Sequence, residues 1–415
     1  MNNNITKIVK SGLCTSCGIC SAICRPDAII FKNSAKPFVC IEKCIDCGLC
    51  LQVCPGQGLD LIHEASLLYS DAQQNNLCGR YLGGYVGYSN NKEIRFTSSS
   101  GGLVTQFLLY LLDKNIINGA IVTGFNNESK VPYSFLATTK DEIISSKGSK
   151  YVLSPINQGL SELLNAKEGK YVIVGLPCQI QGVRKLIKKK YSLQKKIVGV
   201  FSLYCSLNKI QSSVDYYLRH NNVSLDKFES LQFRTEGCLG NMKIVESDSI
   251  KYVKYESYWH GTHSFFVNER CSMCNDHFGE LADISFGDIN IPPYNSDKIG
   301  INSLIVRDRY WKQQLLEAVN DEAISLNEIN IKDILKSQSY CKFYKKGPGL
   351  RATLKIRKTF GYSIPNISMG NEINIPFSFY IKSIIAAIMR FVGRKKYLWL
   401  IINMLDKSIW SNRPQ

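Results

Sequence analysis

Two short cysteine runs near the start of the chain repeat one spacing and constrain its fold more than any other feature. Each run reads C-x2-C-x2-C-x3-C, and Pro26 or Pro55 follows closely. Three thiolates at this spacing hold three irons of a cubane, and in two-cluster modules the fourth cysteine of each run binds the other cluster. We therefore predict one 4Fe-4S cluster on Cys14, Cys17, Cys20 and Cys54, and a second on Cys44, Cys47, Cys50 and Cys24.

The residues between the cysteines favour iron-sulfur over zinc. Gly18 and Gly48 stand where the backbone must turn tightly beside inorganic sulfide. Zinc sites usually pair two separated C-x2-C knuckles and need neither a third cysteine at x2 nor a fourth at x3. Arg25 departs from the usual Cys-Pro ending of the first run. The stretch resembles a bacterial-type two-cluster ferredoxin module.

Composition indicates a packed, multi-domain protein of a reducing compartment. The 415 residues are 45% hydrophobic and 20% charged, which is ordinary for two to three globular domains. Eight of the 16 cysteines lie in the two runs, so a disulfide scaffold is not expected. The first residues, Met-Asn-Asn-Asn-Ile-Thr-Lys, have no apolar stretch of a secretory signal. We therefore expect a cytoplasmic protein.

The formal net charge of +17 invites comparison with nucleic-acid-binding proteins. That count treats every cysteine as neutral, whereas cluster-bound thiolates are negative. The chain shows no zinc-finger, RRM or helix-turn-helix pattern, so we expect no nucleic-acid partner. We interpret the positive charge as a basic face for an acidic partner, such as a ferredoxin, a nucleotide cofactor or an anionic lipid surface.

Two polar segments of the middle region have the composition of phosphate-binding loops. Ser98, Ser99, Ser100, Gly101 and Gly102 precede an apolar helix. Serines there are expected to cap the helix and leave free amides for a pyrophosphate, although capping without a ligand is the commoner case. Gly148, Ser149, Lys150 and Tyr151 form a short turn whose lysine can neutralise a phosphate. Taken singly, this turn is a solvated loop.

Four further cysteines form a candidate third site. The apolar strands 171–175 and 197–204 end near Cys178 and Cys205, and ligands gather at the carboxyl ends of parallel strands. Cys271 and Cys274 add a C-x2-C pair. Four thiolates suffice for a third 4Fe-4S cluster, but zinc and unliganded buried thiols stay open as alternatives.

The order of these motifs resembles one known family. The ferredoxin-like runs, Ser-Ser-Gly-Gly, Gly-Ser-Lys-Tyr, Gly-Leu-Pro-Cys-Gln, a strand ending in cysteine, C-x2-C and Ala-Asp-Ile-x2-Gly-Asp follow one another as in the coenzyme F420 hydrogenase/dehydrogenase beta-subunit family. Three positions depart from its pattern: Leu176 replaces threonine, Ser206 replaces histidine, and Ile289-Asn290 replaces Trp-Gly. The last two affect the substrate pocket, so coenzyme F420 is not carried over.

The resemblance implies an iron-sulfur flavoprotein. FAD would lie on the two polar loops, 98–102 and 148–151, and a third cluster on Cys178, Cys205, Cys271 and Cys274. The implied organisation is an α+β/α/β chain with a ferredoxin module at 1–65, a linker at 66–80, a mixed α/β flavin and iron-sulfur domain at 81–325 and a helical, basic, amphipathic extension at 326–415.

The function predicted is an oxidoreductase that passes single electrons through 4Fe-4S clusters to FAD and reduces an unidentified substrate. The alternative is an electron-transfer subunit that feeds a separate catalytic partner. A redox partner, ferredoxin or reductase, is expected in both cases. Tyr151, Lys150, His260 and His263 are candidate acids or bases, but none stands out as catalytic.

The residues after Ile375 suggest where the protein works. The two apolar stretches after Ile375 are short and are interrupted by Lys382 or Arg390, so neither stretch spans a bilayer. A basic, aromatic helix pair of this kind either packs on protein or makes a peripheral contact with the inner face of the membrane. Bacterial relatives are associated with polysaccharide biosynthesis, which is an association and not a mechanism.

Overall fold

The computed structural model of the 415-residue chain describes residues 3–31, 35–255, 258–259, 262, 264–370 and 372–410, with side chains described as far as residue 405. His260 and His263, two of the predicted acid or base candidates, lie outside the described residues.

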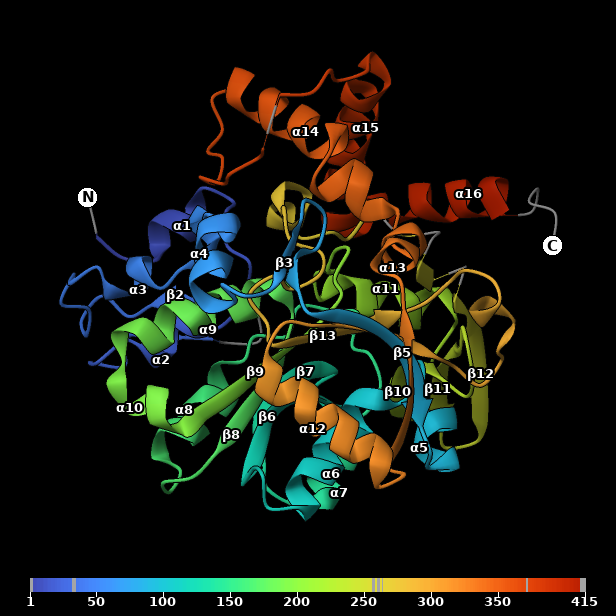
Figure 1. Cartoon of the computed structure of the whole chain (residues 1–415). Coiled ribbons are helices and arrows are strands. Elements are labelled where there is room, and N and C mark those ends of the chain that lie inside the picture. The colour runs from blue at the N-terminus through green and yellow to red at the C-terminus, as the bar shows by residue number, and fades with distance from the viewer. Residues whose placement is uncertain are drawn as a thin grey trace.

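A mixed sheet occupies the centre of the molecule (Figure 1). Within the described residues its order is β15-β5-β14-β13-β9-β8-β6-β7. The central strands β6, β8, β9 and β13 run parallel, and the flanking pairs are antiparallel. The strands are β5 (Gly83–Ser89), β6 (Gly119–Asn126), β7 (Val131–Ala137), β8 (Tyr171–Gly175), β9 (Ile197–Leu203), β13 (Ile284–Asp288), β14 (Asn302–Val306) and β15 (Ile324–Ile329). The prediction of a mixed α/β domain is confirmed.

Helices cover both faces of this sheet because successive side chains of a strand point to opposite faces. Val172 and Phe201 belong to the apolar core under α6 (Leu103–Asp113) and α12 (Arg309–Asn320), where Trp311 packs edge-on against Phe201 at 4.9 Å. Their neighbours Ile173 and Val200 belong to the core under α8 (Asn157–Asn165) and α9 (Pro177–Lys189). The strands are therefore buried on both sides, which explains their continuous apolar sequences.

The amino-terminal segment repeats a small unit. Its elements are α1 (Thr6–Lys10), α2 (Ile19–Ala22), β1 (Ile29–Ile30), β2 (Phe38–Val39), α3 (Leu49–Gln52) and η1 (Pro55–Gln57). Gly18 and Gly48 precede α2 and α3 at φ of 88° and 73°, a left-handed conformation that glycine adopts without strain. A Cβ on Gly18 would meet the backbone nitrogen of Asn157 at 2.6 Å. The segment therefore packs directly on α8, and the two share one apolar core.

Shorter elements connect these layers. After the amino-terminal segment come α4 (Leu61–Leu68) and the hairpin β3 (Gln73–Asn75) and β4 (Gly79–Tyr81). A separate three-stranded sheet is formed by β10 (Phe228–Thr235), β11 (Asn241–Glu246) and β12 (Ser249–Lys254). The remaining elements are α5 (Lys92–Thr97), α7 (Lys140–Ser145), α10 (Tyr191–Lys196), α11 (Ser212–His220), η3 (Glu269–Met273), η4 (Tyr294–Ser296), α13 (Ile331–Ser337) and η5 (Cys341–Lys345).

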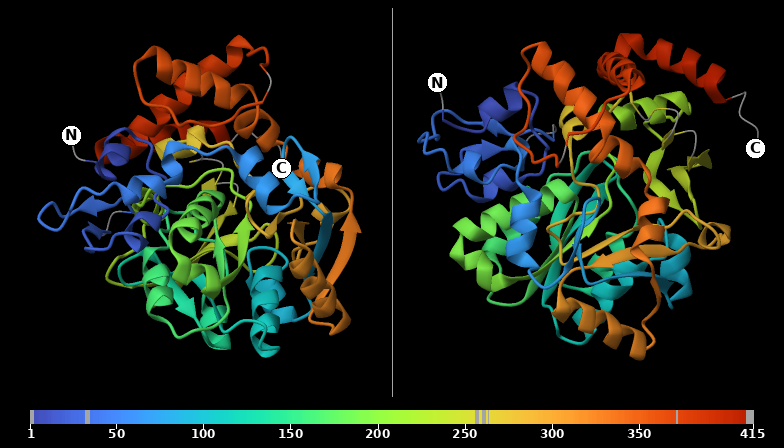
Figure 2. Two further views of the ribbon diagram at one scale, coloured as in Figure 1. Left: turned by 60° about the vertical axis from the view of Figure 1, so that its left-hand side comes forward. Right: turned by 45° about the horizontal axis from the view of Figure 1, so that its top comes forward.

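The carboxyl-terminal segment is helical and lies at the outside of the molecule, away from the central sheet (Figure 2). It contains α14 (Pro348–Thr359), α15 (Phe377–Arg394), η6 (Lys396–Leu398) and α16 (Trp399–Trp410). Among the described residues, no helix combines the length and the apolar character needed to cross a bilayer. The domain boundaries proposed above stay a prediction.

Candidate functional site

The eight cysteines of the amino-terminal runs gather into two groups in the folded chain. The pKa of the Cys20 thiol is raised by burial and then by the neighbouring Cys17, Cys54 and Cys14. The pKa of Cys24 is raised by burial and then by Cys44 and Cys47, and these three line one small cavity with Cys50. Each group thus contains three cysteines of one run and the fourth of the other. This is the crossed arrangement that the spacing predicts, while the role of these thiols as ligands stays a prediction.

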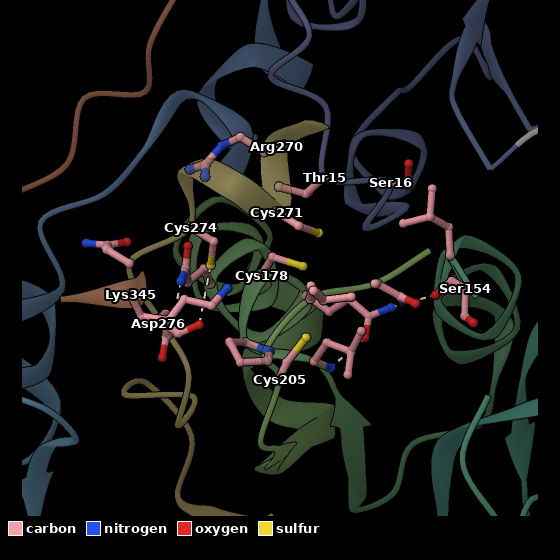
Figure 3. A pocket seen from close by; sticks show the side chains of 18 residues that line it. Thr15, Ser16, Ser154, Cys178, Cys205, Arg270, Cys271, Cys274, Asp276 and Lys345 are labelled. Carbon is pink, nitrogen blue, oxygen red and sulfur yellow. Dashed lines mark hydrogen bonds between the residues drawn. The ribbon is translucent and has the colours of Figure 1, made fainter. Parts of the chain in front are cut away.

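A third group of thiols lies between the sheet and the amino-terminal segment. Cys178 stands at the start of α9, Cys205 follows β9, and Cys271 and Cys274 lie in and just after η3. All four line one cavity, in which their sulfur atoms lie close together (Figure 3). The pKa of Cys178 is raised well above its ordinary value by burial, then by Cys17 and the other three thiols.

The donor set of each group suits an iron-sulfur cluster. Within the described residues, no group of three or more His, Cys, Asp or Glu side chains is placed to hold a metal ion directly. Ligands of a four-iron cluster stand further apart than ligands of one ion, because the cluster itself lies between them. Buried thiols that raise one another's pKa lose their protons readily only when bound metal compensates the negative charge.

The three groups form a row that leads toward the sheet. Cys50 of the second group contributes to the raised pKa of Cys20 in the first group. Thr15 and Ser16, from the loop of the first group, line the cavity of the third group. Cys205 lines both that cavity and a much larger one beyond it.

The larger cavity measures about 1050 Å³ and opens at the carboxyl ends of the parallel strands. Its lining includes Val174 of β8, Leu203 of β9 and Asp288 of β13. This edge of an α/β sheet is where ligands usually bind. The residues predicted to hold FAD line it as well, with Gly101 as the exception: Ser98, Ser99, Ser100, Gly102, Gly148, Ser149, Lys150 and Tyr151.

One hydrogen-bond chain joins the two predicted loops. The Ser149 amide donates to Ser99 Oγ at 2.7 Å, and Ser99 Oγ donates to the carbonyl of Arg234 at 3.1 Å. Ser98 Oγ is buried and has no hydrogen-bond partner among the described residues. An unpartnered buried hydroxyl in a cavity wall fits a loop that binds a ligand oxygen.

The expectation that these serines cap the helix is wrong. Gly102 is the N-cap residue of α6, at φ of 73°, and no side chain caps the helix there. Ser100 Oγ instead donates to the carbonyl of Ile301 at 2.8 Å, and the Leu103 amide donates to Asn302 Oδ1 at 3.2 Å. The Leu103 amide is therefore not free to bind a ligand. Asn302 belongs to β14, and nothing in the sequence indicates that β14 lies beside this loop.

Lys150 and Tyr151 have structural partners at the cavity wall. Lys150 Nζ donates to the carbonyls of Lys147 and Gly148, both at 3.0 Å, and also to that of Ser146. Burial lowers the pKa of Lys150 to about 7. The Tyr151 ring packs against Trp259 with centroids 4.4 Å apart. Lysine thus closes the turn after α7, and tyrosine belongs to an aromatic wall.

Sequence reasoning did not identify two polar groups of the large cavity. Buried Arg234 pairs with Asp288 at 2.5 Å. His277 Nε2 lies 3.1 Å from Gln338 Oε1, and burial lowers the pKa of His277 to about 3, so this imidazole is neutral at pH 7. Neither pair has a sequence signal, because its members are 54 and 61 residues apart.

Lys345 is a further polar residue beside the proposed sites that the sequence did not reveal. The Lys345 side chain is 2% exposed and lines the third cavity with the cysteines (Figure 3). Burial by itself would lower the pKa of Lys345, but the neighbouring Cys274, Tyr340, Cys205 and Cys271 raise it. Lys346 pairs with buried Glu280 at 2.6 Å.

A large cavity at the carboxyl edge of a mixed sheet, approached by a row of thiol groups, suits an oxidoreductase. Two models of the coenzyme F420 hydrogenase/dehydrogenase beta-subunit family match the chain. The model of the family's amino-terminal part matches residues 84–161, and the model of its carboxyl-terminal part matches residues 168–332. The chain belongs to this family, and it is an oxidoreductase with a role in electron transfer.

Several known proteins are similar to this chain. The coenzyme F420 hydrogenase subunit beta of Methanothermobacter thermautotrophicus is 32% identical over 209 residues, which are 49% of this chain and 71% of that protein. The coenzyme F420-dependent sulfite reductase of Methanocaldococcus jannaschii is 26% identical over 369 residues, or 82% of this chain. The match spans only about half of that reductase, 53% of its length.

A solved structure shares the fold. A chain of the F420-reducing [NiFe] hydrogenase complex from Methanosarcina barkeri superposes with a TM-score of 0.54 and 22% sequence identity. The superposition covers 74% of this chain and 99% of that one.

Proposed function

We propose that this chain binds three 4Fe-4S clusters and FAD, and that it reduces an organic substrate with electrons from a partner protein. The observation that carries the proposal is the row of three four-thiol groups that ends at the large cavity. Bound there, the clusters would carry electrons singly and FAD would collect them in pairs.

The chain's own residues bind these groups and keep water away. Cys14, Cys17, Cys20 and Cys54 are all buried, so a cluster held there would lie in a dry environment. Ser98 and the loop 148–151 line the cavity in which FAD would lie. Asp288, on the same wall, is paired with buried Arg234 and would be the more accessible of the two to polar groups of the flavin or of the substrate.

A second candidate function is an electron-transfer subunit without its own substrate. It is favoured by the names of the relatives, because several are called subunits of hydrogenases or dehydrogenases. A ferredoxin or a reductase would be the partner in either case. The association with polysaccharide biosynthesis stays a prediction.

Anaerobic purification with iron, sulfide and flavin analysis tests the proposal. We expect about twelve irons and about one FAD per chain. Cys178→Ala should remove about four of those irons, whereas Cys341→Ala, at a buried cysteine outside the three groups, should remove none. About eight irons without flavin in the unaltered protein would contradict the reductase function.

Turnover distinguishes the two candidates. A self-contained reductase oxidises a chemical electron donor when a suitable substrate is supplied and no partner is present. An electron-transfer subunit retains the clusters but turns over only when a catalytic partner is added.

A further inference from the structure

The helices α15 and α16 present large apolar side chains to the outside of the molecule. In α15, Phe377, Ile381, Ile384, Ile388 and Phe391 are between 45% and 76% exposed. Their spacing of four, three, four and three residues places them in one row along a helix about 27 Å long. In α16, Leu400, Ile401 and Met404 continue the pattern. We call these eight side chains the outer face.

The inner side of α15 buries little, whereas α16 buries Trp399 and Ile402 in the core of the protein. Among the residues of α15, only Val392 and Gly393 are buried, and Ser383 Oγ lies 3.1 Å from the hydroxyl of Thr353. In α16, Asn403 Oδ1 accepts a hydrogen bond from the Tyr216 hydroxyl at 2.8 Å. A helix that faces water normally has the opposite distribution. An exposed apolar surface of this length therefore indicates a binding face.

The charges that the segment from α15 to the start of α16 itself carries are all positive, although Arg394 pairs with Glu269 and Lys396 with Asp215. Between Phe377 and Leu405 the sequence contains no aspartate or glutamate, and its basic residues are Lys382, Arg390, Arg394, Lys395 and Lys396. Lys382 and Lys395 lie over the rings of Phe379 and Phe391, at 5.1 and 5.9 Å from the ring centres. Cations at the border of an apolar, aromatic face complement anionic lipid headgroups.

A second copy of the chain fits this face less well. The four-three spacing of α15 resembles a coiled-coil seam, but the flanking positions hold Tyr380, Ile385 and Ala387 instead of the charged pairs that select a partner helix. Ile385 is itself half exposed, which makes the face wider than such a seam. Two copies would also bring like charges together. These features favour an anionic occupant.

We propose that the outer face of α15 and α16 docks the protein on an anionic lipid bilayer, with the helices lying in the plane of the headgroups. Lys382 lies inside α15, and this charged side chain at the border of the face suits a helix that lies on the bilayer. The proposal is independent of the cofactors, because none of these residues lines the thiol groups or the large cavity.

Vesicle flotation with the full-length holoprotein tests this docking. We expect it to float with vesicles of equal parts phosphatidylglycerol and phosphatidylcholine and to stay behind with phosphatidylcholine alone. Ile384→Glu together with Ile388→Glu should reduce the bound fraction at least tenfold. Leu225→Glu, at a side chain of similar exposure outside α15 and α16, should leave binding unchanged. Higher salt should weaken binding, since part of the attraction is electrostatic.

Three results would overturn the proposal. The unaltered protein fails to float with the anionic vesicles, or the double variant floats as well as the unaltered protein. The third result is that the unaltered protein binds no vesicles but is a dimer by light scattering, whereas the double variant is a monomer. The outer face would then bind a second copy of the chain. Unchanged circular dichroism of the double variant excludes misfolding, because both substituted side chains are exposed.

Discussion

Replacing Lys345 by methionine is expected to lower the reduction potential of the proposed third cluster, on Cys178, Cys205, Cys271 and Cys274. The Lys345 ammonium is 2% exposed and lines the same cavity as these thiols. Each electron added to a cluster adds negative charge, so a nearby cation stabilises the reduced form. Methionine has a similar length and no charge, so the substitution removes mainly this electrostatic contribution.

The size of the shift follows from Coulomb's law. A unit charge about 6 Å from the added electron, in a protein environment of effective dielectric constant about 20, is worth about 2.8 kcal/mol. At about 2.3 kcal/mol per 100 mV, this corresponds to a decrease of roughly 120 mV. Solvent screens little of this energy, because the side chain is almost fully buried.

Redox titration of the anaerobically purified chain, followed by electron paramagnetic resonance, measures this potential directly. Lys345→Arg keeps the charge, so its potential should stay within about 30 mV of that of the unaltered protein, which is a quarter of the calculated effect. Lys342→Met, at an exposed position of the same short helix η5, is the matched control and should change it little.

An unchanged potential in Lys345→Met, with the iron content intact, would refute the reasoning. Loss of the cluster from both Lys345→Met and Lys345→Arg would refute it too, because the lysine would then be needed for packing and not for its charge.

Three further predictions concern the flavin loop and the amino-terminal packing. Ser98→Ala should reduce retained FAD several-fold without lowering the melting temperature, since its hydroxyl has no protein partner among the described residues; equal flavin retention would contradict its role. Ser99→Ala breaks two hydrogen bonds between loops and should cost about 1–3 kcal/mol of unfolding free energy, measured by denaturant titration. Gly18→Ala should destabilise the chain more than Gly361→Ala in the same assay. Both glycines have positive φ, at a cost of about 1–2 kcal/mol, but only Gly18 lies against another backbone, that of Asn157.

The sequence alone predicted those features that depend on local spacing. The cysteine runs and the glycines between them determine short loops, because neighbouring residues set the backbone path there. The apolar strands ending near Cys178 and Cys205 likewise predicted the sheet edge at which the large cavity opens. Periodicity and spacing are sufficient for such features, since they involve few residues close in sequence.

Only the tertiary structure decided features that depend on distant segments meeting. Asn302 occupies the amide that the serine loop was expected to leave free. Lys345 belongs to a lysine-rich stretch of the sequence, but the fold buries it beside thiols that come from three other places in the chain. The side of α15 that faces outward was likewise not predictable, because an amphipathic pattern shows that two faces differ but not which of them the rest of the protein covers.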